Sequence, residues 1–417
     1  MVECPLHNNY SRRDTQVIET TLNFLGAGGI MQFSIGELLL TGLVLTQVTI
    51  ASVTIYLHRN QAHRGLDLHP VIAHFFRFWL WLATGIVTRE WVAIHRKHHA
   101  KCETVEDPHS PQVEGISKVL WQGYELYRQE AGIHGTLEHY GHMTPDDWLE
   151  RHVYTRLSHL GIALLLLLDI MLFGIAGLVL WAVQMLWIPF WAAGVINGVG
   201  HYWGYRNYET ADASRNISPL GIFIGGEELH SNHHAFPTSA RFSSKWWEFD
   251  LGWAYIRLLS LLGLAKVKRV APARALILEN KESIDLGTVH AVVRNRMYVM
   301  ASYARDVIRP VLRQQRKQCD GSCKQVLRRA RGLLVRDTSQ VNERAHARLE
   351  QILARFHDLK TIYQYRQQLQ SVWTRKAASQ EVLCKALQEW CQQAEASGIT
   401  ALQDFSRRLR GYSLQPV

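Results

Sequence analysis

The sequence lacks the features that mark a small secreted protein or a fibrous one. Its six cysteines match no C-x-x-C framework in 417 residues, which argues against a disulfide-stapled secreted module. We expect Cys319 and Cys323, and also the pair Cys384 and Cys391, to be reduced. Glycine and proline number only 29 and 11 and show no period, which excludes collagen and low-complexity linkers. With 47 % apolar residues, the chain also has too much hydrophobic surface to stay disordered.

Charge is distributed unevenly along the chain. The sequence carries 46 basic and 36 acidic residues, a net charge of +10. From Lys266 onward there are 28 basic and 13 acidic residues, whereas the first 265 residues hold 18 and 23. These opposite balances predict two parts with different surroundings. We divide the chain into an N-terminal extension (1–33), a membrane domain (34–265) and a basic helical region (266–417).

Long runs without charge are confined to the first part of the chain. Leu38–Leu57 contains no charged residue and is long enough to cross a bilayer as a helix. Leu160–Trp203 contains only Asp169 and predicts a helical hairpin of two crossings. Phe78–Thr88 is too short to span and predicts an interfacial or buried helix. Asp169 is either a buried, hydrogen-bonded carboxyl or a functional acid within the membrane.

The histidines are clustered in four short segments that follow or flank these apolar runs. In H-x-x-H-H the imidazoles stand at i, i+3 and i+4, which places them on one face of a helix, so we expect each segment to direct its rings at one point. An asparagine and a histidine in the third segment are also four residues apart. The segments carry His58 and His63; His95, His98 and His99; Asn197 and His201; and His230, His233 and His234.

These nine imidazoles exceed the needs of one metal ion. A structural zinc site takes four ligands, usually with thiolates, and a catalytic zinc keeps three protein ligands. Nitrogen-rich ligation suits iron, copper, nickel and zinc. Nine histidines with an asparagine beside them fit two metal ions with open coordination positions. Two such metals beside a membrane-embedded apolar region predict oxidation of an apolar chain by dioxygen. The metals would supply the oxidant, and the protein would supply position and a dry site.

The spacing H-x4-H, H-x-x-H-H and H-x-x-H-H, each at one end of an apolar region, resembles the membrane fatty acid desaturases. The Δ9 acyl-CoA desaturase type is the most similar branch. Three further segments carry this resemblance, which covers about residues 36–265. They are the D-P-H segment 106–110 (EDPHS), 230–237 (HSNHHAFP) and 246–250 (WWEFD).

The resemblance implies an all-α integral membrane protein. A bundle of membrane helices would be capped by a cytosolic, histidine-rich diiron domain and followed by a soluble helical tail. No catalytic residue beyond the metal ligands is implied, and none is assigned to substrate binding. The implied ligands of the two irons are His58, His63, His95, His98, His99, His201, His230, His233 and His234, with Asn197 holding one metal through a water.

The resemblance also implies a reaction and its partners. With dioxygen as co-substrate, the enzyme would form a cis double bond, at Δ9, in a saturated C16 or C18 chain carried by CoA or phospholipid. No haem-binding H-P-G-G run and no ferredoxin cysteine pattern is present, so a separate electron donor is implied, such as a ferredoxin and its reductase. The expected location is a bacterial inner membrane, with the metal site and the C-terminus in the cytoplasm and the side of residues 1–30 left open.

Two alternatives remain at this point. A fatty acid hydroxylase or ketolase would use similar histidine segments. The basic region could instead be a nucleic-acid-binding or transposase-like remnant, although a basic face that docks on anionic lipid or an acidic redox protein is the interpretation we favour. No nucleic-acid partner is therefore expected. The aromatic and basic residues that leave this alternative open are Tyr363, Tyr365, Trp373, Arg366, Arg375 and Lys376.

Overall fold

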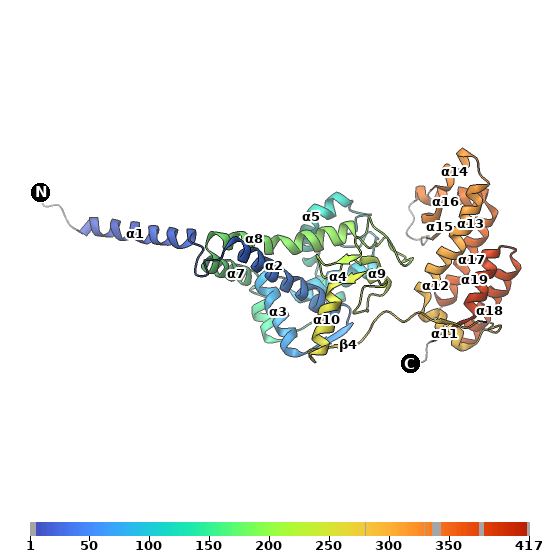
Figure 1. The fold of residues 1–417 in the computed structure, drawn as a ribbon, viewed down its shortest axis with the longest axis horizontal. Helices are drawn as coiled ribbons and strands as arrows, with labels where there is room; N and C mark the ends of the chain where they lie inside the picture. The colour runs from blue at the N-terminus through green and yellow to red at the C-terminus, as the bar shows by residue number, and fades with distance from the viewer. Residues whose placement is uncertain (1–5, 280, 329, 336–342, 375–378, 415–417) are drawn as a thin grey trace. The chain divides into compact units, whose positions relative to one another are not determined.

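The computed structural model describes residues 6–279, 281–328, 330–335, 343–374 and 379–414, and these are mostly helical (Figure 1). The chain divides into two compact units. The first consists of Met1–Gly204, Arg215–His233 and Pro237–Val270. The second consists of Tyr205–Ser214, His234–Phe236 and Ala271–Val417. The sequence did not indicate that two short segments near the third and fourth histidine clusters belong with the C-terminal region.

The helices of the first unit include three π-helical segments, η1, η2 and η3. Its α-helices are α1 (Leu6–Gly26), α2 (Ile35–Ala51), α3 (Pro70–Thr84), α4 (Thr88–Lys101), α5 (Ile116–Ala131), α6 (His134–Tyr140), α7 (Ser158–Phe173), α8 (Ile175–Ile188) and α10 (Leu251–Leu261). The short helix α9 (His230–Ala235) continues into the second unit. The π-helical segments are η1 (Ser52–Ala62), η2 (Glu150–Thr155) and η3 (Pro189–Val199).

The first apolar run forms one long helix, α2 followed by η1. Ser34 begins it with a capping box, in which its hydroxyl accepts from the Glu37 amide while the Glu37 carboxylate accepts from the Ser34 amide. Ile35–Ala62 has 28 residues, which gives about 40 Å of helix and exceeds the hydrocarbon thickness of a bilayer. The predicted span at Leu38–Leu57 is therefore present and is extended at both ends.

The second apolar run forms the predicted helical hairpin. The helix α7 ends at Phe173 and α8 begins at Ile175, with Gly174 alone between them at a φ of +61°. A Cβ at Gly174 would lie 2.2 Å from the carbonyl oxygen of Leu25, so only glycine fits this turn. The helix α8 continues into η3, and Ile175–Val199 is long and apolar enough to cross a membrane, whereas α7 is shorter.

The segment between the first two histidine clusters is sharply bent. The helices α3 and α4 meet at 91°, and Gly85 between them has a φ of +63°. The apolar residues of Phe78–Thr88 thus lie at the end of α3 and in this turn. Counting this bent pair as one span, the described residues contain up to three candidate membrane spans, and otherwise two.

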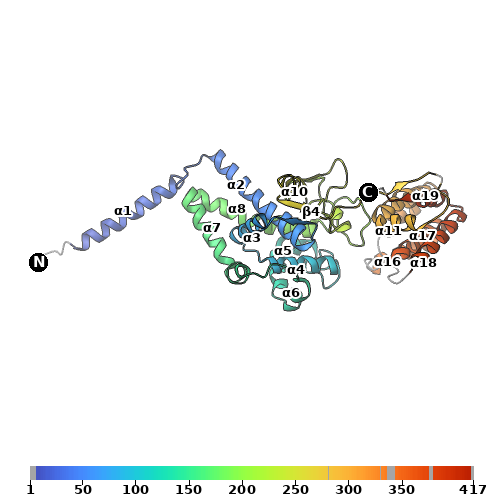
Figure 2. The same ribbon diagram turned by 90° about the horizontal axis from the view of Figure 1, so that it is seen from below.

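The membrane helices pack on one another and expose apolar side chains on their outer faces. The helix α3 contacts α7, and α2 contacts α8, as both views show (Figure 2). On α2, Leu39 and Leu43 stand one turn apart and are 71 % and 58 % exposed. An apolar stripe on the outside is costly in water and favourable in lipid.

Short strands tie the rest of the first unit together. The strand β1 (Leu66–Leu68) pairs antiparallel with β4 (Ala265–Val267), with Leu66 opposite Val267. The strand β2 (Leu220–Gly221) pairs parallel with β3 (Phe249–Asp250). The first pair joins the loop after the first histidine cluster to the segment that follows α10, and the second pair joins the segments on either side of the fourth cluster.

The second unit is built around an aliphatic and aromatic core. Its helices are α11 (Leu286–Arg294), α12 (Arg296–Tyr303), η4 (Ala304–Ile308), α13 (Arg309–Lys317), α14 (Gly321–Leu327), α15 (Ala330–Val335), α16 (Glu343–Arg355), α17 (His357–Thr374), α18 (Gln380–Ala396) and α19 (Thr400–Arg410). The strands β5 (Leu276–Ile277) and β6 (Tyr412–Ser413) pair antiparallel. Cys319 and Cys323 form a disulfide, so the expectation that they are reduced is wrong for this structure, whereas Cys384 and Cys391 are free thiols as expected.

Candidate metal centre

The first histidine pair depends on the π-helical form of η1. Residues five apart point about 140° away from each other in an α-helix, which would separate His58 from His63. The amide of His63 instead donates to the carbonyl oxygen of His58 over 3.1 Å, an i→i+5 bond. The two rings are therefore brought to one side, with centroids 4.9 Å apart. The spacing H-x4-H thus becomes a metal-ligand spacing only because the helix widens.

The histidines of α4 divide between two groups. His95 and His99 stand four residues apart and face the pair on η1, whereas His98 faces His201. The expectation that each H-x-x-H-H segment directs its rings at one point is therefore wrong for α4. Two neighbouring groups of imidazoles replace the single point, and α4 contributes to both.

The first group consists of five imidazoles in the first unit. One ring nitrogen from each lies within 4.8 Å of all the others. Two nitrogens that bind one ion at about 2.1 Å and at right angles lie about 3 Å apart. The observed spacings fit this geometry, so the donor set suits a metal ion. The Nε2–Nε2 distances are 3.0 Å for His58–His233, 2.8 Å for His63–His95, 3.1 Å for His95–His99 and 2.9 Å for His99–His233.

The second group lies next to the first and includes His98, His201 and His230. The Nε2 atom of His201 lies 3.1 Å from that of His98 and 2.8 Å from that of His230. All three side chains are buried. The thiol of Cys102 lies 4.0 Å from Nε2 of His98, a neighbour that the sequence reasoning missed because cysteine is absent from the resemblance.

Carboxylates hold the outer nitrogen of several of these rings. Nδ1 of His58 lies 2.7 Å from Glu227, and Nδ1 of His98 lies 2.9 Å from Asp107. Nδ1 of His201 lies 3.2 Å from Glu103. A carboxylate that accepts from Nδ1–H fixes the tautomer and leaves Nε2 to face a metal. The D-P-H segment drew attention to Asp107, but nothing in the sequence indicated the role of Glu103 or Glu227.

The electrostatics of these carboxyls differ. Burial alone would raise the pKa of Asp107, but His98, His109 and the amide of Glu103 hold that pKa well below its usual range. Burial raises the pKa of Glu227 to about 8, although Arg59 and the hydroxyl of Thr54 oppose the rise. A cation bound at the neighbouring imidazole would favour the carboxylate form of Glu227.

Backbone and buried charge fix the loop that carries Glu227. The Glu228 carboxylate accepts from the amides of Phe223, Ile224 and Gly226 over 2.6 to 3.2 Å. The fully buried guanidinium of Arg59, next to His58 in sequence, donates to Asp250 and to the carbonyl oxygen of Gly225. The loop is therefore held by its own hydrogen bonds through Glu228, and it is tied to η1 through Gly225 and Arg59 on the N-terminal side of Glu227.

The last predicted ligand, His234, directly follows His233, the residue at which this segment of the first unit ends. His234 belongs to the second unit, where its Nδ1 lies 2.8 Å from the Asp212 carboxylate. The backbone amide and the hydroxyl of Ser214 donate to the same carboxylate. His234 therefore carries the same carboxylate pairing as His58, His98 and His201.

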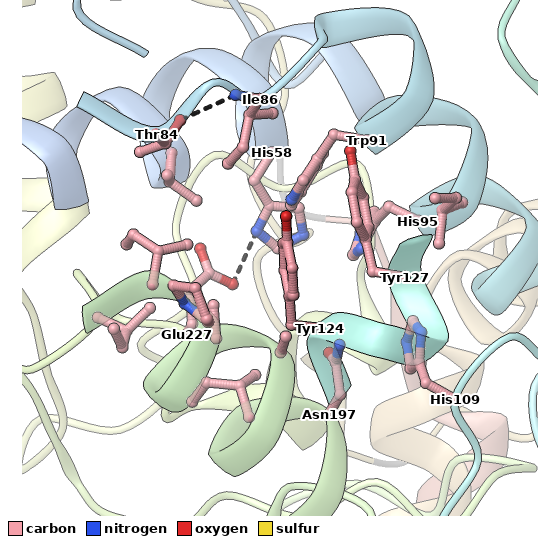
Figure 3. A pocket seen from close by; sticks show the side chains of 18 of the residues that line it. His58, Thr84, Ile86, Trp91, His95, His109, Tyr124, Tyr127, Asn197 and Glu227 are labelled. Atoms are coloured by element: carbon pink, nitrogen blue, oxygen red, sulfur yellow. Dashed lines mark hydrogen bonds and ion pairs between the residues drawn. The ribbon is translucent and has the colours of Figure 1, made fainter. Parts of the chain in front are cut away.

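Both histidine groups contribute to the wall of one largely apolar cavity in the first unit. His58 and His95 of the first group and His230 of the second line it, together with Asn197. Figure 3 shows Trp91, Tyr124 and Tyr127 around the same space, with Glu227 beside His58. Asn197 thus lies where the sequence placed it, at the histidine end of η3, and its role as a ligand stays a prediction.

Comparison with known proteins agrees with this geometry. Residues 37–263 match the fatty acid desaturase family. The chain belongs to the fatty acid desaturase family. It is accordingly an integral membrane protein and an enzyme of a diiron oxidoreductase family. The resemblance drawn from the histidine spacing is confirmed.

Several plant desaturases are similar to this chain. The Delta-9 acyl-lipid desaturase 1 of Arabidopsis thaliana is 33 % identical over 227 residues, which is 54 % of this chain and 72 % of that protein. The Delta-9 desaturase-like 5 protein of the same plant is 33 % identical over 247 residues, covering 55 % and 76 %. The acyl-CoA 5-desaturase of Anemone leveillei is 34 % identical over 225 residues, covering 52 % and 66 %. Because these names differ in acyl carrier and bond position, the family alone fixes neither.

The C-terminal region has a separate likeness. Residues 293–414 match a transposase family. The match covers most of the helices of the second unit and none of the histidine groups of the first. The sequence reasoning had kept a transposase-like remnant as an alternative for this region.

Proposed function

We propose that this chain is an oxygen-dependent acyl desaturase that forms a cis Δ9 double bond in a saturated C16 or C18 chain. One observation carries the proposal, namely two groups of buried and half-buried imidazoles that open on a single apolar cavity. An apolar chain in that cavity would lie against His58, His95 and His230. Water would be excluded there by aromatic and aliphatic side chains.

The proposed ligands of two iron ions are the nine histidines named from the sequence, with Asn197 acting through a water. Imidazole is a good ligand for iron, and the nitrogen spacings in the first group suit one ion. Bound iron, with dioxygen, would supply the oxidising chemistry of the site. The cytosolic, histidine-rich cap over a membrane bundle is the fold that this proposal requires.

The chain's own residues would orient and protect the reaction. Glu227, Asp107 and Glu103 fix the imidazoles of His58, His98 and His201 through Nδ1, so that Nε2 faces inward. The cavity wall would hold adjacent methylenes at one depth, and the distance from the acyl head group would select the carbons that react.

The proposed reaction needs an external reductant. Forming the double bond releases two hydrogens, which carry two electrons. Reducing dioxygen to water takes up four electrons, so a donor supplies the remaining two electrons. We infer a separate donor, such as a ferredoxin with its reductase, because the sequence contains no H-P-G-G run and no ferredoxin cysteine pattern. The acyl chain would arrive as acyl-CoA or within a phospholipid.

We further infer that the histidine groups and the basic C-terminal region lie on the cytoplasmic side of a bacterial inner membrane. The excess of basic over acidic residues after Lys266 supports this orientation. Reporters fused at His69 and after Val417 should both read cytoplasmic. Opposite labels at the two positions would contradict the proposed topology.

The transposase likeness favours a second candidate activity, binding of DNA phosphates by the C-terminal region. Arg309, Arg313 and Lys317 are exposed at one-turn intervals on α13 and form no ion pair among the described residues. Fluorescence anisotropy with a labelled duplex at two salt concentrations tests this activity, because phosphate contacts weaken steeply as salt rises. If the basic C-terminal region instead docks on anionic lipid or an acidic redox protein, we expect no binding to DNA at physiological salt.

Fatty-acid analysis tests the main proposal. In a host unable to make unsaturated fatty acids, the chain should produce palmitoleate or oleate, and only when oxygen is present. A double bond elsewhere would contradict the Δ9 position and keep the desaturase. A hydroxylated product without a new double bond would contradict the desaturase itself. Assays with purified acyl-CoA and with phospholipid vesicles distinguish the two carriers.

A further inference from the structure

One face of the helix formed by α8 and η3 lines the cavity between Gln184 and Asn197. Gln184, Ile188, Ala192 and Ile196 follow one another at intervals of four residues and all belong to the cavity wall. The same wall continues to Asn197 beside the histidines. At 1.5 Å per residue, the stretch from Gln184 to Asn197 is about 20 Å long, and slightly less where the helix is π-helical.

The two ends of this face are polar and its middle is apolar. Gln184 is the lining residue farthest from Asn197 on this helix, and it is only 1 % exposed. Its amide nitrogen donates to the Asp169 carboxylate over 3.1 Å. Its carbonyl oxygen is buried and has no hydrogen-bond partner among the described protein atoms. A buried, unpaired carbonyl oxygen next to an apolar chain is unfavourable.

The tight hairpin fixes Gln184 in this position. A Cβ on Gly177 would lie 1.9 Å from the carbonyl oxygen of Asp169, so glycine permits the close approach of α8 to α7. Trp181 adds a second link, since its indole N–H donates to the carbonyl oxygen of Ile162 over 3.2 Å. If Gln184 turned away, the buried Asp169 carboxyl would lose its partner. The pairing also defines the orientation of the amide, because only the NH₂ group can donate to a carboxylate.

We propose that Gln184, positioned by Asp169, is the chain-length gauge of this enzyme. The proposal rests on the acyl desaturase function proposed above. A methyl terminus would pack favourably against the apolar part of the wall, including Ile188. Further methylenes would have to displace the fixed amide or be buried against its unpaired oxygen. Gln184 would thus determine specificity, while Asp169 would act on the substrate only through Gln184.

The product distribution of matched variants tests the gauge. In the host lacking unsaturated fatty acids, fed equal amounts of saturated acids of increasing length, Gln184→Ala should raise the ratio of longer to shorter unsaturated products about tenfold or more. Gln184→Trp should lower this ratio by a similar factor, because a larger side chain shortens the apolar part. Asp169→Leu, which removes the partner of Gln184, should broaden the distribution toward longer chains.

The control lies on the same helix and outside the cavity. Leu186 is exposed and is not part of the wall, so Leu186→Ala should leave the distribution unchanged. If Gln184→Ala prevents folding, the product ratios of Gln184→Trp and Asp169→Leu still test whether Gln184 limits chain length. An active wild type with the same product lengths in all Gln184 and Asp169 variants would overturn the gauge. A wild type with no unsaturated product would instead contradict the proposed function.

Discussion

Buried positions in the first unit hold many polar and charged side chains, whereas those in the second unit are mostly aliphatic and aromatic. His58, Arg59 and Asp107 are all buried in the first unit. In the second unit, Leu359 and Val299 represent a core that extends through α11 to α19. The outer faces differ in the opposite sense, since α2 exposes Leu39 and Leu43 while α13 exposes arginines.

This contrast shows how the solvent shapes each part. A helix in lipid gains nothing from hiding its leucines, so its interior is available for polar groups that serve a site. A helical unit with an aliphatic and aromatic core depends on hydrophobic burial for its stability. In this chain, therefore, the interior of one unit holds the polar groups of the site, and the interior of the other provides the hydrophobic burial that stabilises the fold.

The largest expected effect comes from removing one buried imidazole of the first unit. His233→Ala should abolish desaturation, because its Nε2 lies within 3.0 Å of the Nε2 atoms of His58 and His99. Fatty-acid analysis measures the loss. His134→Ala, which changes an exposed histidine outside both groups, should retain the activity. Full activity of His233→Ala would remove that residue from the proposed site.

The next effect concerns buried charge. Arg59→Ala would leave the buried Asp250 carboxylate without its ion-pair partner, which typically costs about 3–5 kcal/mol. Thermal unfolding of the purified protein in detergent measures the change. Lys118→Ala breaks the more exposed pair with Glu114 and should change stability by no more than about 0.5 kcal/mol. Equal effects of the two variants would contradict the distinction between buried and exposed charge.

A matched pair of leucines compares the two interiors directly. Leu359→Ala in the core of the second unit should destabilise that unit by about 2–5 kcal/mol. Leu43→Ala on the outer face of α2 creates no cavity, so we expect little change in stability. Limited proteolysis and denaturant unfolding of the full chain report both. Similar losses would show that the face of α2 packs against protein.

The smallest effect is at a helix terminus of the second unit. Asp285 caps α11, and hydrogen bonds from Lys281 and the Thr288 amide lower the pKa of its carboxyl to about 2. Asp285→Ala should cost about 1 kcal/mol. Because the folded-state pKa lies below the unfolded value of about 3.9, this contribution is complete above pH 4 or so and is lost as pH falls toward 2. Asp285→Asn, which caps without titrating, should lose this pH dependence in an unfolding series.

Much of the membrane domain could be predicted from the sequence, because charge and apolar length are local properties. The span at Leu38–Leu57 and the helical hairpin within Leu160–Trp203 follow from the absence of charge alone, although in the hairpin only Ile175–Val199 is long enough to cross a membrane. The histidines were found for a similar reason, since their spacing is local. The widening of η1, which brings His58 and His63 together, was not predictable because no residue pattern marks a π-helix.

The outer carboxylates show where sequence reasoning ends. Glu227 is 169 residues from His58, and Glu103 is 98 residues from His201. Only the folded chain brings these groups within hydrogen-bond distance, and acidic residues are too common for their positions to stand out. Asp169 was noticed as the only charge in its run, but its partner Gln184 was found only from the packing of α7 on α8.

Metal analysis of the purified full-length protein tests the central claim most directly. If the two imidazole groups hold two iron ions, the wild type should contain about two irons per chain. Glu227→Gln, which weakens the hold on His58, should lower metal affinity about 10- to 100-fold and reduce that content. A wild type that retains less than about one iron per chain after reconstitution, or that takes up zinc in its place, would contradict the account.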